Sequence, residues 1–495
     1  MTRIFTSLRF FLFPLILLIP AFAQGKTIAV IGGGLAGLTT AYELQKLIDA
    51  NPLTEKVTLH LYEAKERLGG RVFTVHLEGK PAELGGENIN DGGEALHIRR
   101  VAKELGLKIK SRKTSLYTRV YFDPSSKKEY KIEELKPYFP KITQKQLVKT
   151  LAEGEKRSKN LGQVLDFFFS KYPALTSAEK KHRLLLRKAI AGAMQSYEGG
   201  EVGQLSVRYA HGSLAEMMMP FLAGYKPEPY ATDSIEGGNS NLVLALAQKL
   251  KGRIQMNRPL VEIKKSSLGF ELRFESQGTT EKIYADIVVL AIPGKPYGNI
   301  QFGDGTIDPQ RLEAIKTISY ASHAKILVPA PPPEEYKMIS TPGVDIWRQS
   351  EDSWYTLYFH GEAGLMKNQS DLKNGFNLAN QALPASQKMT LKNEIQVPIK
   401  IFSEYQEPVA MAWTQDPFIQ ASYSFFTPRM REQLEKTVLV DGIKVLPLFL
   451  PIDRKIFFAG EHTTTDQDIR GTMEAAVGSG DSAAKLVWAA IAKAK

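Results

Sequence analysis

One stretch near the start of the chain constrains the fold more than any other. An apolar run rich in β-branched residues, Thr27-Ile28-Ala29-Val30-Ile31, leads into Gly32-Gly33-Gly34-Leu35-Ala36-Gly37, which satisfies the pattern G-x-G-x-x-G. Such a run is typical of a strand buried on both faces. In the pattern, Gly32 allows a tight turn, Gly34 lets the backbone approach a pyrophosphate, and Gly37 lets the next helix pack closely on the strand. The stretch therefore predicts a strand, a phosphate-binding turn and a helix.

The residues that follow complete a dinucleotide-binding unit. Helical apolar spacing predicts a helix over residues 35–50, and alternating apolar residues predict a second strand over 57–62. That strand leads to Glu63, 26 positions after Gly37, where a carboxylate would accept hydrogen bonds from both hydroxyls of an adenosine ribose. The usual spacing is nearer ~20, and the polar turn over 49–56 absorbs the excess. This order of elements predicts an α/β fold with a Rossmann-like domain.

The residues after the second strand indicate which dinucleotide binds. Residues 63–71 have the form E-A-x-x-R-x-G-G-R. This resembles the signature of the flavin-dependent amine oxidase family, whose members include monoamine oxidases, polyamine oxidases, L-amino-acid oxidases and histone-lysine demethylases. In that family the glycines pass close to the flavin, and two arginines, here Arg67 and Arg71, meet the phosphates and the flavin edge. The resemblance implies that the chain binds FAD.

Three later segments resemble further motifs of the same family. Residues 82–89 resemble its E-L-G-G-E-x-I element, whose backbone lies against the flavin ring, and residues 456–463 and 470–480 resemble its A-G-E and G-x-M-E-x-A-x-x-S-G motifs. A helix starting at Thr472 would turn its free N–H groups toward flavin O2. For Val261 a core strand position is the alternative. The resemblance implies FAD contacts from Gly32, Gly34, Leu35, Ala36, Gly37, Glu63, Ala64, Arg67, Gly70, Arg71, Gly85, Gly86, Glu87, Val261, Trp413, Gly460, Glu461, Thr472 and Met473.

Three residues are candidates for the chemistry itself. Lys325 precedes an apolar strand and resembles the buried family lysine that holds a water against flavin N5, where a cation favours electron transfer to oxygen. A solvent-facing lysine is the alternative. Tyr423 aligns with one wall of the amine-binding aromatic cage, and a core or surface tyrosine is the alternative. Thr472 stands where monoamine oxidases have the second cage tyrosine, which implies a wider or more polar cavity.

Two further departures from the family pattern bear on cofactor and substrate. Ser422 falls where monoamine oxidases carry a flavin-linked cysteine, and the chain has no cysteine, so non-covalent FAD is predicted. Asn88 stands where L-amino-acid oxidases place the arginine that pairs with a substrate carboxylate. Without that bidentate partner, plain amines are favoured over amino acids.

The length of the chain, 495 residues, predicts two domains. The order of motifs assigns residues 26–95, 233–300 and 410–490 to a discontinuous FAD-binding domain of the GR2 type. Residues 96–232 and 301–409 then form an α+β substrate-binding domain.

The first residues predict export. Arg3 and Arg9 precede the apolar run 10–19, and Ala21-Phe22-Ala23 offers small residues for a signal peptidase. Residues 1–23 are thus predicted to be a signal peptide, with a secreted or periplasmic protein starting near Gln24. No stable membrane anchor is expected after cleavage, and an uncleaved anchor is the alternative.

Charge and histidine placement exclude other kinds of partner. The formal net charge is +11, but lysines crowd residues 141–188 with helical periodicity, which is typical of a solvated face. No nucleic-acid recognition motif is present, so no such partner is predicted. The eight histidines are scattered, and His462 has no partner histidine at ligand spacing. No metal is predicted.

The resemblance predicts an exported flavin enzyme that oxidises a primary or secondary amine to an imine or aldehyde while dioxygen is reduced to hydrogen peroxide. Two enzyme alternatives stay open: an L-amino-acid oxidase, and a flavin dehydrogenase or desaturase with another electron acceptor. A third alternative, of a different class, is a flavin-carrying binding protein without turnover. The particular amine, the physiological acceptor and the oligomeric state are not predicted.

Overall fold

The computed structural model of the chain describes residues 25–53, 55–90, 93–113, 118–226, 231–276, 278–349, 351–430, 436–466 and 468–493. The predicted signal peptide lies outside these residues. Among the helices of the described part, none is both long and apolar enough to cross a bilayer.

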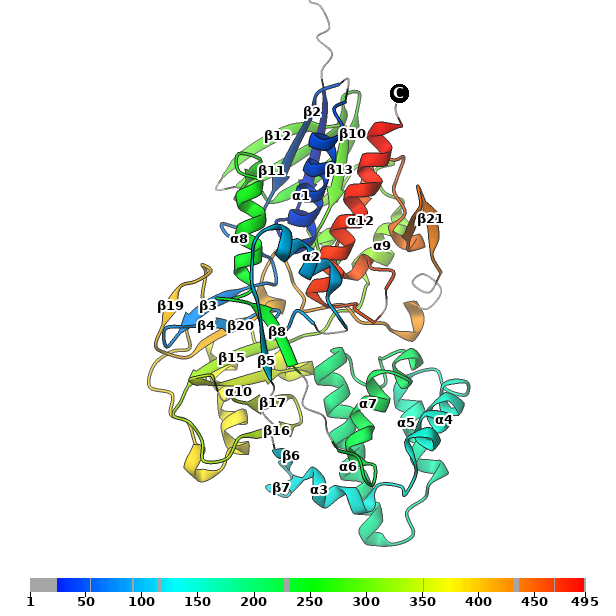
Figure 1. Cartoon of the computed structure of the whole chain (residues 1–495), viewed down its shortest axis with the longest axis vertical. Coiled ribbons are helices and arrows are strands. Elements are labelled where there is room, and N and C mark those ends of the chain that lie inside the picture. Colours follow the sequence, from blue (N-terminus) through cyan, green and yellow to red (C-terminus); the bar gives the residue numbers. More distant parts are fainter. Residues whose placement is uncertain are drawn as a thin grey trace, which may run out of the picture.

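A five-stranded parallel sheet forms the upper part of the molecule (Figure 1). Its strands, in spatial order, are β23 (Ile456–Phe458), β13 (Ile287–Leu290), β1 (Lys26–Ile31), β2 (Val57–Tyr62) and β9 (Ile254–Gln255). The helices α1 (Leu35–Ala50) and α12 (Met473–Ala492) lie side by side against it (Figure 1). Central strand β1 is buried from Ile28 to Ile31, as expected where helices and a second layer cover both faces.

Further elements complete this upper part and share its apolar core. An antiparallel layer contains β10 (Leu260–Ser266), β11 (Gly269–Ser276) and β12 (Thr279–Ala285), extended by β14 (Gln301–Phe302). The surrounding helices are α2 (Leu96–Glu104), α8 (Ser240–Lys249) and α9 (Pro309–Lys316), and a small hairpin is formed by β21 (Val438–Val440) and β22 (Ile443–Val445).

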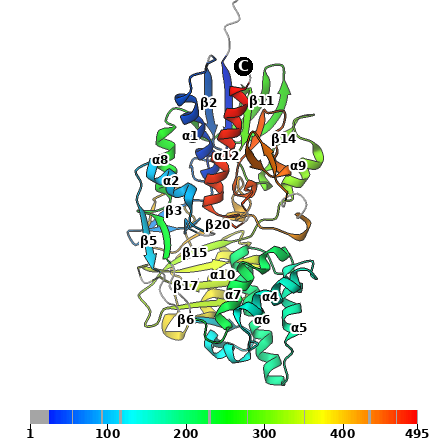
Figure 2. The same ribbon diagram turned by 45° about the vertical axis from the view of Figure 1, so that its right-hand side comes forward.

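A seven-stranded mixed sheet forms the floor of the lower part (Figure 2). Its strands, in spatial order, are β20 (Val409–Ala412), β15 (Ala324–Pro329), β18 (Trp354–Phe359), β17 (Val344–Trp347), β16 (Lys337–Thr341), β6 (Thr118–Asp123) and β7 (Lys128–Lys131). Apolar residues of alternate positions pack against α10 (Gln369–Ala382) on one face. Because side chains alternate along a strand, the residues between them, such as Lys325, turn to the opposite face.

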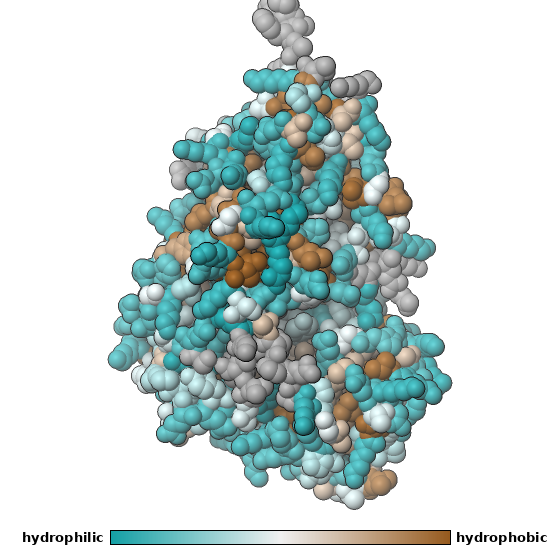
Figure 3. Space-filling model, viewed as in Figure 1, coloured by the Kyte–Doolittle hydropathy of each residue, from teal (hydrophilic) through white to brown (hydrophobic). Residues whose placement is uncertain are grey.

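A helical subregion lies beside this sheet and has an apolar core of its own (Figures 1 and 2). Its helices are α3 (Ile132–Leu135), α4 (Gln144–Glu155), α5 (Leu161–Lys171), α6 (Ser177–Glu198) and α7 (Ser213–Met218). The side chains of Thr143, Asn160 and Thr176 cap α4, α5 and α6 by accepting hydrogen bonds from backbone N–H groups. On the face seen in Figure 3, hydrophilic side chains predominate over this subregion and apolar ones are scattered.

Two small sheets link the upper and lower parts. One pairs β3 (Thr74–Leu77) with β4 (Lys80–Glu83) and β19 (Glu404–Tyr405), and the other pairs β5 (Ile109–Lys113) with β8 (Ala231–Ile235). The parallel sheet together with the mixed sheet and helices confirms the predicted α/β class with a Rossmann-like unit. All five parallel strands fall within residues 26–95, 233–300 and 410–490, whereas β20 straddles the boundary at residue 409, and the domain division stays a prediction.

Candidate active site

One cavity of about 1700 Å³ runs from the turn after β1 to the helices α6 and α7. Pockets for small ligands usually measure roughly 300–1,000 Å³, so this one has room for a dinucleotide and a second ligand. All the residues predicted to contact FAD or substrate line it except Gly37 and Arg67. The structure thus brings together segments that are more than 400 residues apart in sequence, such as Gly32 and Thr472.

The turn after β1 is shaped to admit a phosphate. Gly32 has φ of +108°, a value that L side chains rarely adopt. A Cβ added to Gly34 would meet no heavy atom within 4 Å, whereas one at Gly37 would lie 1.9 Å from the carbonyl oxygen of Gly32. Gly34 therefore faces the cavity at the N-terminus of α1, where free N–H groups favour an anion. Gly37 instead serves the close packing of helix on strand.

The carboxylate of Glu63 is fixed at the end of β2. One oxygen accepts a hydrogen bond from the N–H of Gly33 at 2.6 Å, and the other accepts one from the N–H of Lys65 at 2.9 Å. Burial raises the pKa of Glu63, against the effect of these backbone hydrogen bonds. Each oxygen has a further lone pair, so the carboxylate can still accept a hydroxyl from the cavity.

The two signature arginines have different surroundings. Arg67 lies outside the cavity lining, and its guanidinium donates to the carbonyl oxygen of Gly70 at 2.9 Å and stands 4.2 Å above the ring of Phe73. It supports the glycine loop, and its contact with a phosphate or the flavin edge stays a prediction. Arg71 does line the cavity and donates to Glu461 at 2.9 Å.

Glu461 is buried and anchors two segments. Besides Arg71, it accepts a hydrogen bond from the hydroxyl of Ser424 at 2.6 Å. Burial acts to raise the pKa of Glu461, but the charge of Arg71 and the Ser424 hydrogen bond help to outweigh burial, and the pKa is lowered. Glu461 is therefore an anion within the cavity wall.

Lys325 is buried, with 5% of its surface exposed, so the alternative of a solvent-facing lysine is wrong. Its ammonium donates to the carbonyl oxygens of Glu83 at 2.9 Å and Gly85 at 3.4 Å, and to the carboxylate of Glu87 at 3.1 Å. An ammonium has three donors, so protein acceptors engage all of them. To hold a water at flavin N5, Lys325 must release one of these three acceptors. Its contact with the carbonyl oxygen of Gly85 is the longest of the three. That function stays a prediction.

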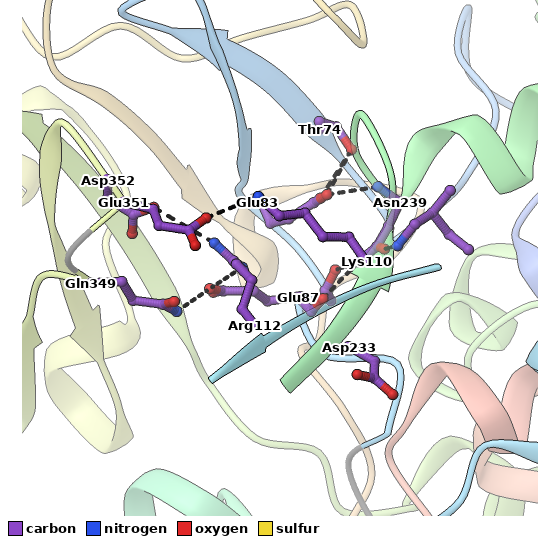
Figure 4. A network of polar contacts seen from close by, with 12 residues as sticks. Thr74, Glu83, Glu87, Lys110, Arg112, Asp233, Asn239, Gln349, Glu351 and Asp352 are labelled. Carbon is purple, nitrogen blue, oxygen red and sulfur yellow. Dashed lines mark hydrogen bonds and ion pairs between the residues drawn. The ribbon is translucent and has the colours of Figure 1, made fainter. Parts of the chain in front are cut away.

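The segment that contains these acceptors is held by Asn239, the residue at the N-terminal end of α8. Its side chain makes no capping hydrogen bond, because the amide donates to the carbonyl oxygens of Gly86 at 3.0 Å and Glu87 at 2.7 Å. Its backbone N–H donates to the carboxylate of Glu83, which also accepts from Thr74 (Figure 4). Burial raises the pKa of Glu83 to about 7.

A stack of three rings forms one wall of the cavity. His323 lies between Tyr358 and Tyr423, each with its ring centroid 4.7 Å away. The hydroxyl of Tyr423 is directed at the backbone carbonyls of Tyr197 at 2.9 Å and Ser196 at 3.1 Å. Burial lowers the pKa of His323 to about 3, so the stack is uncharged at neutral pH. His323 was missed because no local pattern showed that β18 would pair beside it.

Thr472 is the N-cap of α12, as the predicted helix start requires. Its hydroxyl accepts from the N–H of Ala475 at 3.2 Å and donates to the carbonyl oxygen of Ile469 at 2.6 Å. The hydroxyl is thus committed to the helix end rather than to a ligand. Among the described residues, no group of three or more histidine, aspartate or glutamate side chains is placed to hold a metal.

Comparison with known proteins agrees with this geometry. A family model described as flavin containing amine oxidoreductase matches residues 35–488. Pseudooxynicotine dehydrogenase from Pseudomonas sp is 26% identical over 312 residues, which cover 60% of this chain and 56% of that protein. The chain therefore matches less than two thirds of the length of this relative.

Two more proteins match over most of their length. The L-amino-acid oxidase of Notechis scutatus scutatus is 22% identical over 489 residues, covering 93% of this chain and 86% of that protein. A solved structure of putrescine oxidase bound to putrescine has a TM-score of 0.62 at 15% identity, covering 94% of this chain and 99% of the other. At that identity the structural likeness concerns the fold alone.

Proposed function

Because the chain belongs to the flavin-containing amine oxidoreductase family, with FAD as its expected cofactor, we propose that it oxidises an amine and passes the electrons to dioxygen. The observation that carries the proposal is the single cavity, which joins the phosphate-binding turn at Gly34 to buried Lys325 and the ring stack at Tyr423. These residues would hold a cofactor along the turn, with a cation and an aromatic wall available to its reactive end.

The residues present fit FAD along the upper part of this cavity. The open space beyond Gly34 would take the pyrophosphate, and Glu63 would take the ribose. Backbone at Gly85 and Gly86, together with the N-terminus of α12, would receive the flavin ring. When bound, FAD supplies the two-electron acceptor that amino-acid side chains lack. The chain has no cysteine and Ser422 borders the cavity, which supports non-covalent attachment.

The lower part of the cavity would bind and orient the amine. The substrate must react as a neutral amine, since its nitrogen lone pair assists removal of the neighbouring hydride. The neutral imidazole of His323 adds no positive charge to the ring stack, so the electron-rich faces would attract the protonated form of the amine, which loses its proton before it reacts. The amine becomes an imine, and water converts this to an aldehyde and ammonia or a shorter amine.

Lys325 would act on the second half of the cycle. Dioxygen takes up two electrons and two protons to become hydrogen peroxide, and negative charge develops on it as the electrons arrive. A fixed cation in a site with little water stabilises that charge without reorganising. The family lysine position and the burial of Lys325 support this assignment.

Stopped-flow spectroscopy of the FAD-loaded protein tests the proposal. Mixed anaerobically with monoamines, diamines, polyamines and amino acids in turn, the flavin should bleach with at least one amine. Its colour should return on admission of oxygen, with one hydrogen peroxide formed per amine consumed. Bleaching that only a dye reverses would assign a dehydrogenase, and bleaching by amino acids alone would assign an amino-acid oxidase. A flavin that no amine bleaches would overturn the proposal.

Export is a separate proposal, supported by the arginine-flanked apolar run and Ala21-Phe22-Ala23. The mature protein should begin within a residue or two of Gln24 and be found outside the cytoplasm. Intact-mass measurement of the fractionated protein checks this, and a soluble cytoplasmic protein that keeps Met1 would contradict it.

A further inference from the structure

A row of polar residues crosses the seven-stranded sheet beneath the cavity. In adjacent strands β15, β18, β17, β16 and β6, the residues directly opposite one another are Lys325, Tyr358, Asp345, Ser340 and Tyr121. Directly opposite residues point to the same face of a sheet, and all five line the cavity. The row leads away from Lys325, so it faces the part of a substrate that does not react.

Asp345 is the exceptional member of this row. Its side chain is 4% exposed and opens onto the cavity, and among the described residues the one charge interaction recorded for its carboxylate is with His360. A buried carboxylate without a partner is costly, because its charge has lost water and gained nothing in return. The carboxylate lines the cavity, where a positively charged ligand would give it the partner that the neighbouring side chains do not.

The basic groups near Asp345 do not neutralise it. His360 is close enough for Asp345 to act to raise its pKa, but burial has the larger effect and lowers the pKa of His360, so its imidazole is mainly neutral. Lys325 is bound to Glu87, and it lies two strands from Asp345, about 10 Å between backbones. Arg119 is exposed, and it is two strands away on the other side.

Two aromatic rings flank the carboxylate. Tyr358 is opposite Asp345 on β18, and Trp347 is two residues further along β17 on the same face. The two rings meet edge to face with centroids 5.9 Å apart, and both line the cavity. A carboxylate beside aromatic faces is a typical environment for an organic cation, which gains both charge attraction and cation–π contacts.

We propose that Asp345 binds a second cationic nitrogen of the substrate, so that diamines and polyamines are the preferred substrate class. This rests on the proposed function. The reacting amine lies at the flavin end, near Lys325 and Tyr423, and the second nitrogen lies two strands away over Asp345. An amino acid, whose second group is a carboxylate, would be repelled there.

Length-matched substrates test the proposal: 1,5-diaminopentane against pentylamine. The wild type should prefer the diamine. Asp345→Asn should lower kcat/KM for the diamine by about 10- to 100-fold, the usual effect of losing a hydrogen bond to a charged group, mainly through KM. Pentylamine should change by less than about twofold, and its turnover also reports that the variant is folded. Asp345→Glu should keep part of the preference.

Glu129→Gln is the matched control. Glu129 is a carboxylate on β7 of the same sheet and pairs with Lys337 at 3.3 Å outside the cavity, so neither substrate should change. Glu198 is the competing candidate, since it also lines the cavity but already accepts a hydrogen bond from Ser213. Loss of diamine preference in Glu198→Gln with none in Asp345→Asn would overturn the assignment to Asp345.

Calorimetric binding of an unreactive dication separates this inference from the proposed function. 1,5-Bis(trimethylammonium)pentane cannot be oxidised as an amine, and it should bind the FAD-loaded wild type about tenfold or more tighter than Asp345→Asn. If no amine bleaches the flavin but this difference is found, the cation site stands and the oxidase proposal fails. If amines are oxidised but the dication binds both proteins equally, the oxidase proposal stands and the cation site fails.

Discussion

At the scale of single residues, the charge on Lys325 is balanced by one shared carboxylate. Glu87 accepts from Lys325 at 3.1 Å. It also accepts from Gln349 at 3.3 Å and lies 3.8 Å from Arg112 (Figure 4). Burial and the charge of Glu87 raise the pKa of Asp352 to about 7, so this network carries little excess negative charge at neutral pH. Removing Lys325 would leave Glu87 with Arg112 as its nearest cation.

Substitution of Lys325 separates the two half-reactions. Lys325→Met keeps the length of the side chain and removes its charge and donors. Flavin reduction by amine should change by less than about tenfold, and reoxidation by oxygen should slow by about 10²–10³, the usual effect of removing a group that stabilises developing negative charge. Anaerobic and aerobic stopped-flow traces measure the two rates separately.

Two further variants test whether the loss of the Lys325 charge is the cause of slow reoxidation. Lys325→Met/Glu87→Gln removes the carboxylate that the single change leaves behind, so it should regain thermal stability but stay slow in reoxidation. Lys337→Met, a strand lysine of the same sheet outside the cavity, should leave both rates unchanged. Normal reoxidation in the Lys325 variant would remove this residue from the site.

Motif residues could be predicted individually, but their partners could not. The E-L-G-G element indicated Gly85 and Gly86 from sequence, whereas the hydrogen bonds of Asn239 to this segment join residues about 150 positions apart. Arg67 is a second example, since the motif indicated the residue but not that its guanidinium would donate to the carbonyl oxygen of Gly70. A pattern indicates which residue types a site needs, and it does not fix which atoms they meet.

At the scale of elements, the turn between β1 and α1 and the first residues of α1 contain glycines with two different functions, phosphate binding and helix packing. Gly34→Val adds atoms where a Cβ meets nothing within 4 Å, so the FAD-free protein should fold normally. The side chain would occupy phosphate space and lower FAD affinity by about 10- to 100-fold, since overpacking typically costs about 1–3 kcal/mol. Gly37→Ala places a Cβ 1.9 Å from the carbonyl of Gly32 and should destabilise the fold itself.

Fluorescence titration with FAD and thermal unfolding of the FAD-free protein distinguish the two variants. Gly192→Ala is the control. A Cβ added at Gly192, in helix α6, also meets nothing within 4 Å, and this position lies outside the cavity lining. It should bind FAD as the wild type does. Equal loss of unfolding temperature in Gly34→Val and Gly37→Ala would contradict the division of functions.

Local signals were sufficient for many of the elements. The β-branched run, the glycine pattern and the helix start at Thr472 all act through neighbours within a few residues, so sequence spacing predicted them. Asn239 stands at the N-cap of α8 without a capping hydrogen bond, because its amide donates to a distant segment. Short-range chemistry sets an element's bounds, and long-range contacts decide what its polar side chains do.

At the scale of the whole molecule, the cavity exists because the chain crosses several times between the upper and lower parts. β3 pairs with β19, and β6 pairs with β16, over separations of more than 200 residues. No periodicity in the sequence specifies which distant strand lies beside which. The row that contains Asp345 depends on four strand registers, one of which joins β6 to β16 over more than 200 residues. Sequence analysis did not single Asp345 out because none of these registers can be read from the sequence pattern.

Burial also gives the folded molecule proton affinities that differ from those of the unfolded chain. Burial lowers the pKa of His462 from an ordinary value of 6.5 to about 4, so between these values the unfolded chain binds a proton that the folded protein does not. The stability this group contributes is complete above pH 6.5 and is lost as the pH falls toward 4. Glu83 affects the pH dependence of stability in the opposite direction, since its pKa is raised from 4.5 to about 7. Its contribution is complete below pH 4.5 and is lost as the pH rises through 7.

Matched variants should therefore change the pH dependence of stability in opposite directions. His462→Asn removes the proton uptake on unfolding, so on going from pH 6.5 to 5 the variant should lose roughly 2 kcal/mol less stability than the wild type, at about 1.4 kcal/mol per pH unit for one proton. Glu83→Gln should lose less stability than the wild type between pH 5 and 7.5. Scanning calorimetry across this range gives Tm differences of each variant from the wild type, which cancel the titration of all other groups. If both differences stay constant with pH, the two groups titrate as they do in the unfolded chain, and their burial does not control their protonation.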